Sequence, residues 1–106
     1  MKFDIIYITT KDAKEARIIG KVLIDERLVA CVNIIAGMES LYRWQGKLEH
    51  DTEAILIAKT RSALTKRVIG RVKELHSYAC PCIVSFAIDQ GNKEYLEWLE
   101  AETTGR

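Results

Sequence analysis

The segment RIIGKV at Arg17–Val22 recurs as RVIGRV at Arg67–Val72, and this repeat is the main guide to the fold. Upstream, IIYITT at Ile5–Thr10 matches ILIAKT at Ile55–Thr60 with the same offset of 50 residues. Similarity that keeps its order over successive segments indicates an internal repeat of one structural unit. The sequence therefore predicts two copies of the same arrangement of secondary structure.

Each copy of the repeat has the pattern of a strand followed by a helix. Ile5–Ile8 and Ala54–Ala58 are short apolar runs rich in β-branched residues, which is typical of strands covered on both faces. Asp12, with a glutamate three residues later, predicts a capped helix start in the first copy. The helix of the second copy is expected to be capped by Ser62 or Thr60 and to bury a stripe formed by Leu64, Val68, Val72 and Leu75.

Two further strands and a last helix complete the pattern. Leu28–Ile35 and Cys82–Ile88 have the extended, apolar character of strands, and Asn92 is suited to cap a short C-terminal helix. Two strand–helix–strand units in tandem predict an α+β fold, the ferredoxin-like βαββαβ arrangement, with both helices on one face of an antiparallel sheet. At this length the chain is expected to form a single domain over residues 1–106.

The glycines of the repeat are expected to face each other. Gly20 and Gly70 occupy matching positions in the two helices. A glycine inside a helix costs about 1 kcal/mol relative to alanine. Close packing of the two helices at these positions would offset that cost.

The predicted sheet is apolar on both faces. Because side chains alternate along a strand, one face receives Ile5, Tyr7, Ile55 and Ile57, and the other receives Ile6, Ile8, Leu56 and Ala58. The helices of one chain cover only one of these faces. The other face is therefore expected to pack against a partner.

A long hairpin between the two halves indicates the same kind of partner. Only Gly37 interrupts the extended pattern from Leu28 to Trp44. At about 3.3 Å per residue this arm could span roughly 55 Å, against a radius of gyration of about 13 Å for a compact chain of this size. Tyr42 and Trp44 near its tip are expected to contact another subunit, unless the hairpin folds back at Gly37 and buries both rings locally.

The composition argues against several classes of function. Lys and Arg total 16 against 15 for Asp and Glu, so the net charge of +1 predicts no nucleic-acid partner and no attraction to a membrane. The first apolar run contains Asp4 and is neither a signal peptide nor a membrane span, so a cytoplasmic location with free thiols is expected. No Ser, His and Asp set stands at suggestive positions, and no enzymatic activity is predicted.

Five motifs, in order and at consistent separations, resemble one known family. They are ERLVACVNII (Glu26–Ile35), ESLYRWQGKLE (Glu39–Glu49), EAILIAKT (Glu53–Thr60), LHSYACPCI (Leu75–Ile83) and GNKEYLEWL (Gly91–Leu99). Together they resemble the CutA family, also called the divalent cation tolerance proteins. The resemblance implies a cytoplasmic homotrimer of ferredoxin-like subunits whose arms embrace their neighbours. It also implies an association with copper and other divalent metals, and an architecture similar to that of the PII-type signalling trimers.

The sequence departs from the family pattern around the metal-associated motif. His76-Ser77-Tyr78 stands where His-Pro-Tyr is common, and Cys82 stands where a glutamate usually follows the later proline. Copper-linked members offer a cysteine and a second histidine where this chain has Ile8 and Leu75. Only His76 therefore carries over from the family as a metal-ligand candidate.

The stretch LHSYACPCIVSF (Leu75–Phe86) adds ligand candidates of its own. Cys80 and Cys82 are two residues apart, so on an extended backbone their side chains leave by the same face, and His76 lies just upstream. Thiolates and imidazole together suit Cu(I) or Zn(II). A sharp turn at Pro81 would let His76 and at least one thiol meet.

Cys31 is the fourth candidate metal donor, because the repeat places it opposite Cys82, and Glu53 could add a carboxylate. The alternative is that the cysteines are small buried hydrophobic residues, which is the favoured interpretation for Cys31 and as good as the metal one for Cys80 and Cys82. A site with these donors would be weak and open rather than a closed tetrahedral cage, and no metal is expected to be required for folding.

Two functions remain open at this point. The first is a small homotrimeric protein of metal tolerance that binds copper or another divalent cation through His76, Cys80 and Cys82. The second is a trimeric PII-like signalling or scaffold module that binds a small molecule or a protein partner at the clefts between subunits.

Overall fold

The computed structural model describes residues 1–104 and has the predicted βαββαβ order followed by a C-terminal helix. The elements are β1 (Phe3–Thr10), α1 (Ala13–Asp25), β2 (Cys31–Trp44), β3 (Lys47–Arg61), a short 3-10 turn (Ser62–Leu64), α2 (Thr65–Leu75), β4 (Ile83–Ile88) and α3 (Lys93–Thr103). The strands form one sheet in the order β2-β3-β1-β4, and every neighbouring pair is antiparallel. The predicted ferredoxin-like α+β fold is confirmed.

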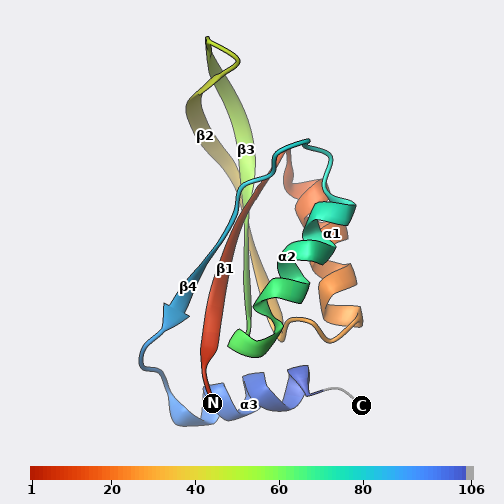
Figure 1. The fold of residues 1–106 in the computed structure, drawn as a ribbon, viewed down its shortest axis with the longest axis vertical. Helices are drawn as coiled ribbons and strands as arrows, with labels where there is room; N and C mark the ends of the chain where they lie inside the picture. The colour runs from red at the N-terminus through yellow and green to blue at the C-terminus, as the bar shows by residue number, and fades with distance from the viewer. Residues whose placement is uncertain (105–106) are drawn as a thin grey trace.

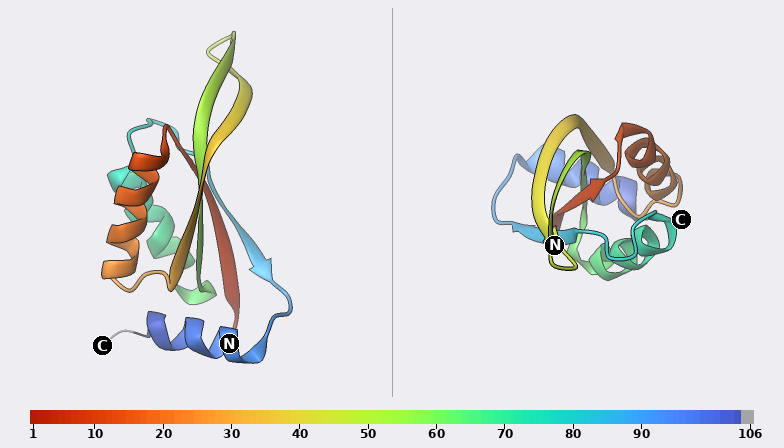
Figure 2. Two further views of the ribbon diagram at one scale, coloured as in Figure 1. Left: turned by 180° about the vertical axis from the view of Figure 1, so that it is seen from behind. Right: turned by 90° about the horizontal axis from the view of Figure 1, so that it is seen from above.

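Both repeat helices pack on the same face of the sheet (Figures 1 and 2). The core lies between them and the strands, and its fully buried members include Ile6, Ile8, Leu56, Ala58, Ile19, Leu23, Val68 and Val72. These are the side chains that the alternation along the strands and the helical stripes assign to this layer. Helix α3 crosses the end of the sheet that lies farthest from the arm (Figure 1).

The first repeat helix begins as the sequence predicts, and the second does not. Asp12 Oδ1 accepts a hydrogen bond of 2.8 Å from the Glu15 amide, while Glu15 Oε1 accepts one of 3.0 Å from the Lys11 amide. This pair of bonds is a variant of the capping box, in which the glutamate bonds to the amide one residue before the N-cap. Neither Thr60 nor Ser62 caps α2, because the chain enters that helix through the 3-10 turn. The Ser62 hydroxyl instead donates to Asp4 Oδ1 at 2.8 Å, which ties the turn to β1.

The prediction that Gly20 and Gly70 face each other is wrong. A Cβ added to Gly20 would lie 3.0 Å from Cγ2 of Val32 and 3.4 Å from Cδ1 of Leu56, so this glycine allows α1 to approach the sheet. A Cβ added to Gly70 would meet nothing within 4 Å, and Gly70 is exposed. The repeat therefore conserves the residue type at the two positions but not its surroundings.

We expect Gly70→Ala to raise the free energy of unfolding by up to about 1 kcal/mol, because alanine removes the entropic cost of a helical glycine and meets open space. Gly20→Ala is the matched control. It should lower the free energy of unfolding, because the new methyl group would press on Val32 in the core. Urea unfolding of both variants checks this pair, and a Gly70→Ala protein less stable than the parent would contradict it.

The β2–β3 hairpin projects as an arm beyond the rest of the fold (Figures 1 and 2). Its pairing runs from Cys31 opposite Lys59 to Trp44 opposite Lys47, with a bulge between Ile35 and Met38. The arm accounts for a longest dimension of 45 Å. Near its tip Tyr42 remains 38% exposed and Trp44 45% exposed, so the chain bulges at Gly37 without folding back to bury the rings.

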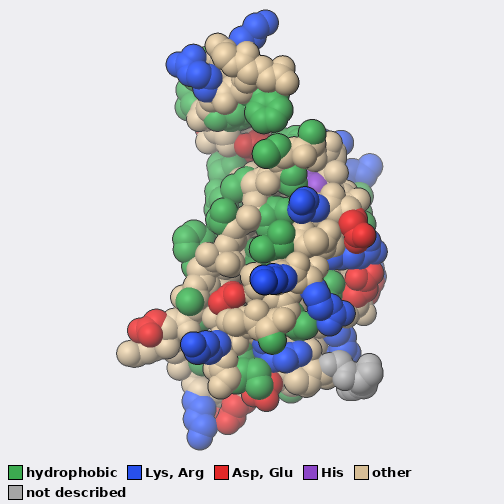
Figure 3. Space-filling model, viewed as in Figure 1, with side chains coloured by type: hydrophobic (Ala, Val, Ile, Leu, Met, Phe, Trp, Pro, Cys, Tyr) green, Lys and Arg blue, Asp and Glu red, His purple; other side chains and the backbone are tan. Residues whose placement is uncertain are grey.

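The face of the sheet opposite α1 and α2 exposes apolar side chains. Ile35 is 50% exposed, Val84 45% and Phe86 57%. Figure 3 shows exposed hydrophobic side chains on the side of the molecule that carries β4 and the base of the arm. An isolated protomer would leave this surface in contact with water, which is unfavourable.

Candidate functional site

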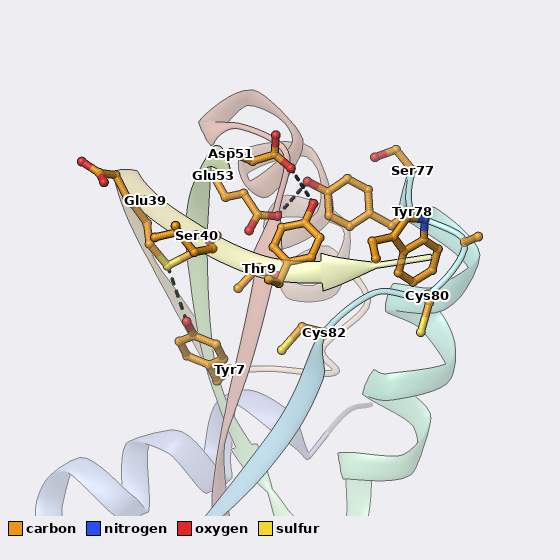
Figure 4. A pocket seen from close by; sticks show the side chains of 15 residues that line it. Tyr7, Thr9, Glu39, Ser40, Asp51, Glu53, Ser77, Tyr78, Cys80 and Cys82 are labelled. Atoms are coloured by element: carbon orange, nitrogen blue, oxygen red, sulfur yellow. Dashed lines mark hydrogen bonds between the residues drawn. The ribbon is translucent and has the colours of Figure 1, made fainter. Parts of the chain in front are cut away.

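An open pocket of about 830 Å³ lies where the base of the arm meets the loop between α2 and β4 (Figure 4). The arm, the end of β1 and this loop all contribute side chains. The lining residues are Tyr7, Thr9, Met38, Glu39, Ser40, Leu41, Tyr42, Trp44, Asp51, Glu53, Ser77, Tyr78, Ala79, Cys80 and Cys82. We call this the arm-base pocket.

Glu53 is the most buried carboxylate of the arm-base pocket. It lies on β3 opposite Met38, directly after the bulge, and is only 6% exposed. The Tyr78 hydroxyl donates a hydrogen bond of 2.7 Å to Glu53 Oε2 (Figure 4). Burial raises the pKa of Tyr78, and the bond to Glu53 raises it further, so this phenol remains protonated at neutral pH. The loop thus supplies the donor that allows a carboxylate to be buried on the sheet.

A second phenol and carboxylate pair stands farther out along the arm. The Tyr42 hydroxyl donates to Asp51 Oδ2 at 2.5 Å, and this bond raises the pKa of Tyr42 to about 12. Tyr7 contributes a third phenol, which donates to Met38 Sδ at 3.6 Å. Among the residues that line the pocket there is no Lys, Arg or His. The charged side chains among these lining residues are therefore all carboxylates, set beside aromatic rings, thiols and aliphatic groups.

His76 does not line the pocket, although the sequence analysis named it as a metal ligand. Its side chain is fully buried. Nε2 lies 2.7 Å from the carbonyl oxygen of Thr9, which can only accept, so Nε2 carries the proton. Nδ1 accepts a hydrogen bond of 3.0 Å from the Tyr78 amide. Both ring nitrogens are occupied by the backbone, so His76 joins α2 and the loop to β1 and leaves no nitrogen free for a metal.

Glu15 makes a second connection between the loop and the first repeat unit. Its Oε2 accepts a hydrogen bond of 2.8 Å from the Ser77 amide, while Oε1 caps the start of α1. Burial acts to raise the pKa of Glu15, but the hydrogen bonds from Lys11 and Ser77 outweigh it and leave that pKa below its ordinary value. The sequence analysis assigned Glu15 to the helix cap alone, since nothing in the local pattern indicates a contact with Ser77.

The three cysteines occupy two distant places. Cys80 and Cys82 are exposed thiols in the wall of the arm-base pocket (Figure 4). Cys31 begins β2 at the other end of the sheet, where its Sγ lies 3.3 Å from the Tyr95 hydroxyl of α3. The carbonyl of Cys82 accepts from the Thr9 amide at 3.3 Å, whereas Cys31 pairs with Lys59. The expectation that Cys31 neighbours Cys82 is wrong: Cys31 begins β2 and Cys82 directly precedes β4, but these strands run in opposite directions at the two edges of the sheet, so the two starts lie at opposite ends.

The structure therefore brings together only part of the predicted ligand set. Cys80, Cys82 and the helper Glu53 share one pocket, while His76 and Cys31 lie outside it. Within residues 1–104 no group of three or more His, Cys, Asp or Glu side chains is assembled as a metal site. Two cysteines and three acidic residues, Glu39, Asp51 and Glu53, nevertheless line the same pocket, which suits a cation better than an anion.

Residues 4–102 match the model of a family described as "CutA1 divalent ion tolerance protein". The chain belongs to the CutA family. A relative from Thermus thermophilus, the "Divalent-cation tolerance protein CutA", is 45% identical over 100 residues that cover 94% of this chain and 97% of the relative. A protein of the same name from Archaeoglobus fulgidus is 44% identical over 95 residues, which cover 90% of this chain and 92% of that protein.

Solved CutA structures have the same fold. A crystal structure of CutA1 from Oryza sativa superposes with a TM-score of 0.95 at 37% identity and covers 100% of this chain and 97% of its own. The Thermus thermophilus structure gives a TM-score of 0.92 at 44% identity, with 95% of this chain and 98% of its own covered. The family resemblance stated from five motifs is thus confirmed.

Membership of the CutA family does not fix the compartment. A relative from rice is named chloroplastic, and the solved structure from Archaeoglobus fulgidus is described as periplasmic. Within residues 1–104, no helix is both long enough and apolar enough to cross a membrane.

We expect His76→Ala to lower the free energy of unfolding by about 2 kcal/mol or more, because it leaves the Thr9 carbonyl and the Tyr78 amide without their partner. His50→Ala is the matched control. His50 is 61% exposed on the arm and makes only a surface ion pair of 3.4 Å with Glu39, so its loss should change stability by less than about 0.5 kcal/mol. Equal effects in urea unfolding would contradict the structural role of His76.

Proposed function

We propose that this protein is a homotrimeric, cytoplasmic CutA protein that binds a divalent or soft metal ion, such as copper or zinc, at the arm-base pocket. In this proposal the protein contributes to metal tolerance by binding the metal, and it does not catalyse a reaction. One observation carries the proposal: Cys80 and Cys82 line the same pocket as the buried carboxylate of Glu53. The names of the relatives, which refer to divalent-cation tolerance, support it.

The donor set suits the proposed metals. Thiolate sulfur favours Cu(I) and Zn(II), and a carboxylate oxygen can complete a zinc site. Cys80 and Cys82 lie on the loop that follows α2, and this loop would have to rearrange to bring both thiols to one ion. A site that closes only around its metal is weaker than a preformed cage, since part of the binding energy orders the loop.

The proposed trimer follows from the two surfaces that one protomer leaves uncovered. Burial of the exposed sheet face with Ile35, Val84 and Phe86 would remove apolar area from water. The arm carries Tyr42 and Trp44 well beyond its own core. Rings of this kind are frequent anchors of subunit contacts.

We expect light scattering at micromolar concentration to give three times the protomer mass of 12.1 kDa. Trp44→Ala should shift the protein toward monomer, since loss of a buried anchor ring at an interface costs about 2 kcal/mol or more. Ile18→Ala is the control, because Ile18 is a 55% exposed apolar residue on α1, away from the arm. A parent protein that is monomeric across the dilution series would overturn the proposed assembly.

We expect the reduced protein to bind Cu(I) or Zn(II) in a calorimetric titration with a competing chelator. The double variant Cys80→Ser and Cys82→Ser should lose this binding, while Cys31→Ser, which removes the thiol outside the pocket, should retain it. Affinity should fall as the pH is lowered, because the metal must displace protons from the thiols. Equal binding by the double variant and the parent would refute the assignment of these ligands.

The walls of the pocket also favour a second candidate, a PII-like module that senses a small molecule. Aromatic rings and carboxylates with no basic side chain suit an organic cation such as a polyamine or a quaternary ammonium compound. The same titration distinguishes the two functions. Spermidine or choline bound equally well by metal-free parent protein and by the double cysteine variant would favour the small-molecule function.

A further inference from the structure

A second pocket, of about 390 Å³, is lined by residues at the end of the fold opposite the arm. It is formed where the last turn of α1, the entry to α2 and the end of α3 meet. Its lining residues are Asp25, Glu26, Arg27, Leu28, Arg61, Leu64, Arg67 and Thr103. We call it the arginine pocket, and neither the metal proposal nor the arm-base pocket involves any of its residues.

The carboxylates of the arginine pocket already have cations of their own. Asp25 Oδ2 lies 2.7 Å from Lys21 Nζ. Glu26 accepts hydrogen bonds of 2.9 and 3.0 Å from the Arg71 guanidinium, and these bonds lower the pKa of Glu26. Both pairs lie at the outer surface of the helices. Neither acidic residue forms an ion pair with Arg61 or Arg67 among the described residues, and the three arginines outnumber the two carboxylates in the lining.

Two of the arginines form no ion pair within residues 1–104. Arg61 is half-buried, and its guanidinium is held by neutral groups: Nε donates to Thr103 Oγ1 at 3.1 Å and Nη2 donates to the Thr103 carbonyl at 2.7 Å. Arg67 takes part in none of the hydrogen bonds or salt bridges found among the described residues. The pocket thus contains one guanidinium fixed in place and one free to turn toward a ligand.

The third arginine occupies a backbone position that usually belongs to glycine. The amides of Arg27 and Leu28 bond to the carbonyls of Ile24 and Leu23, each at 3.0 Å, which is the Schellman pattern at a helix end. Arg27 therefore adopts a φ of 59°, in the left-handed region that glycine occupies without strain. A strained residue with a functional side chain can indicate a binding role. Its Nη1 makes two long contacts with Glu102 of α3, to the backbone carbonyl at 3.3 Å and to Oε1 at 3.4 Å.

We propose that the arginine pocket binds a phosphate-type oxyanion, either free phosphate or the phosphoryl group of a small metabolite, through Arg27, Arg61 and Arg67. A guanidinium presents its N–H groups in a planar fork that matches the oxygens of a phosphoryl group. Arg61 is already oriented by Thr103, so less entropy is lost when it binds. The pocket volume exceeds that of one phosphate and leaves room for a small organic group.

The test is a calorimetric titration of the full chain, in chloride buffer free of phosphate and sulfate, with inorganic phosphate, pyrophosphate and glycerol 3-phosphate. Arg67→Ala should weaken binding by about tenfold or more, in line with the loss of a charge-assisted hydrogen bond. Arg17→Ala is the matched control. Arg17 stands at the repeat-related position of α1 and lies outside the arginine pocket, so its variant should bind as the parent does.

A second variant separates binding from folding. Arg27→Gly should weaken anion binding while it preserves or raises the melting temperature, because glycine relieves the left-handed backbone. A purely structural role for Arg27 predicts unchanged anion binding and a lower melting temperature. Tighter binding of glycerol 3-phosphate than of phosphate would identify a phosphorylated metabolite as the source, and the reverse order would identify the free anion.

The proposal is overturned if none of the three anions binds at 10 mM or below, or if Arg17→Ala and Arg67→Ala weaken binding equally. The second result would mean that general surface charge attracts the anion. Because the metal proposal rests on Cys80 and Cys82, at the other end of the molecule, the double cysteine variant should bind these anions unchanged. The two proposals therefore fail or succeed independently.

Discussion

The constraint on which the rest of the structure depends is that β1 and β3 are apolar on both faces, whereas α1 and α2 cover only one. On the covered face Ile6 and Leu56 are completely buried. On the other face Ile35 of β2 and Phe86 of β4, the strands beside them, are half exposed. The fold of the protomer is therefore incomplete in its burial, and the arm continues β2 and β3 beyond one end of the sheet.

The arm-base pocket exists because two long-range connections hold a loop against a bulged hairpin. His76 and Glu15 attach the loop to β1 and α1 through backbone groups. Tyr78, which follows directly, is thereby directed onto Glu53 of the arm. The bulge between Ile35 and Met38 shifts the register next to Glu53, as bulges near functional sites commonly do. Removing the loop's attachments would expose a carboxylate that is now buried.

The fold was predictable from sequence because its information is local and repeated. Strand alternation, two helical stripes and the capping box at Asp12 all act within a few residues, and the offset of 50 residues orders them. The site was predictable only in part. Cys80 and Cys82 are recognisable in the sequence as possible ligands on one loop. The hydrogen bond of His76 to the Thr9 carbonyl was not predictable, because Thr9 lies 67 residues away in the chain. The repeat did not predict the surroundings of its two glycines. Gly20 packs against the sheet, whereas the equivalent Gly70 faces open space.

The central position of β1 in the sheet affects how the chain can fold during synthesis. Phe3 pairs with Arg61 on one side and with Ile88 on the other, so the first strand made needs the last strand to complete its hydrogen bonds. Contacts between such distant residues require closure of large loops before they stabilise anything, which slows folding. During synthesis the apolar strand β1 therefore keeps one edge unpaired until β4 has been made. The same strand that organises the finished sheet is thus the part of the nascent chain most exposed to aggregation.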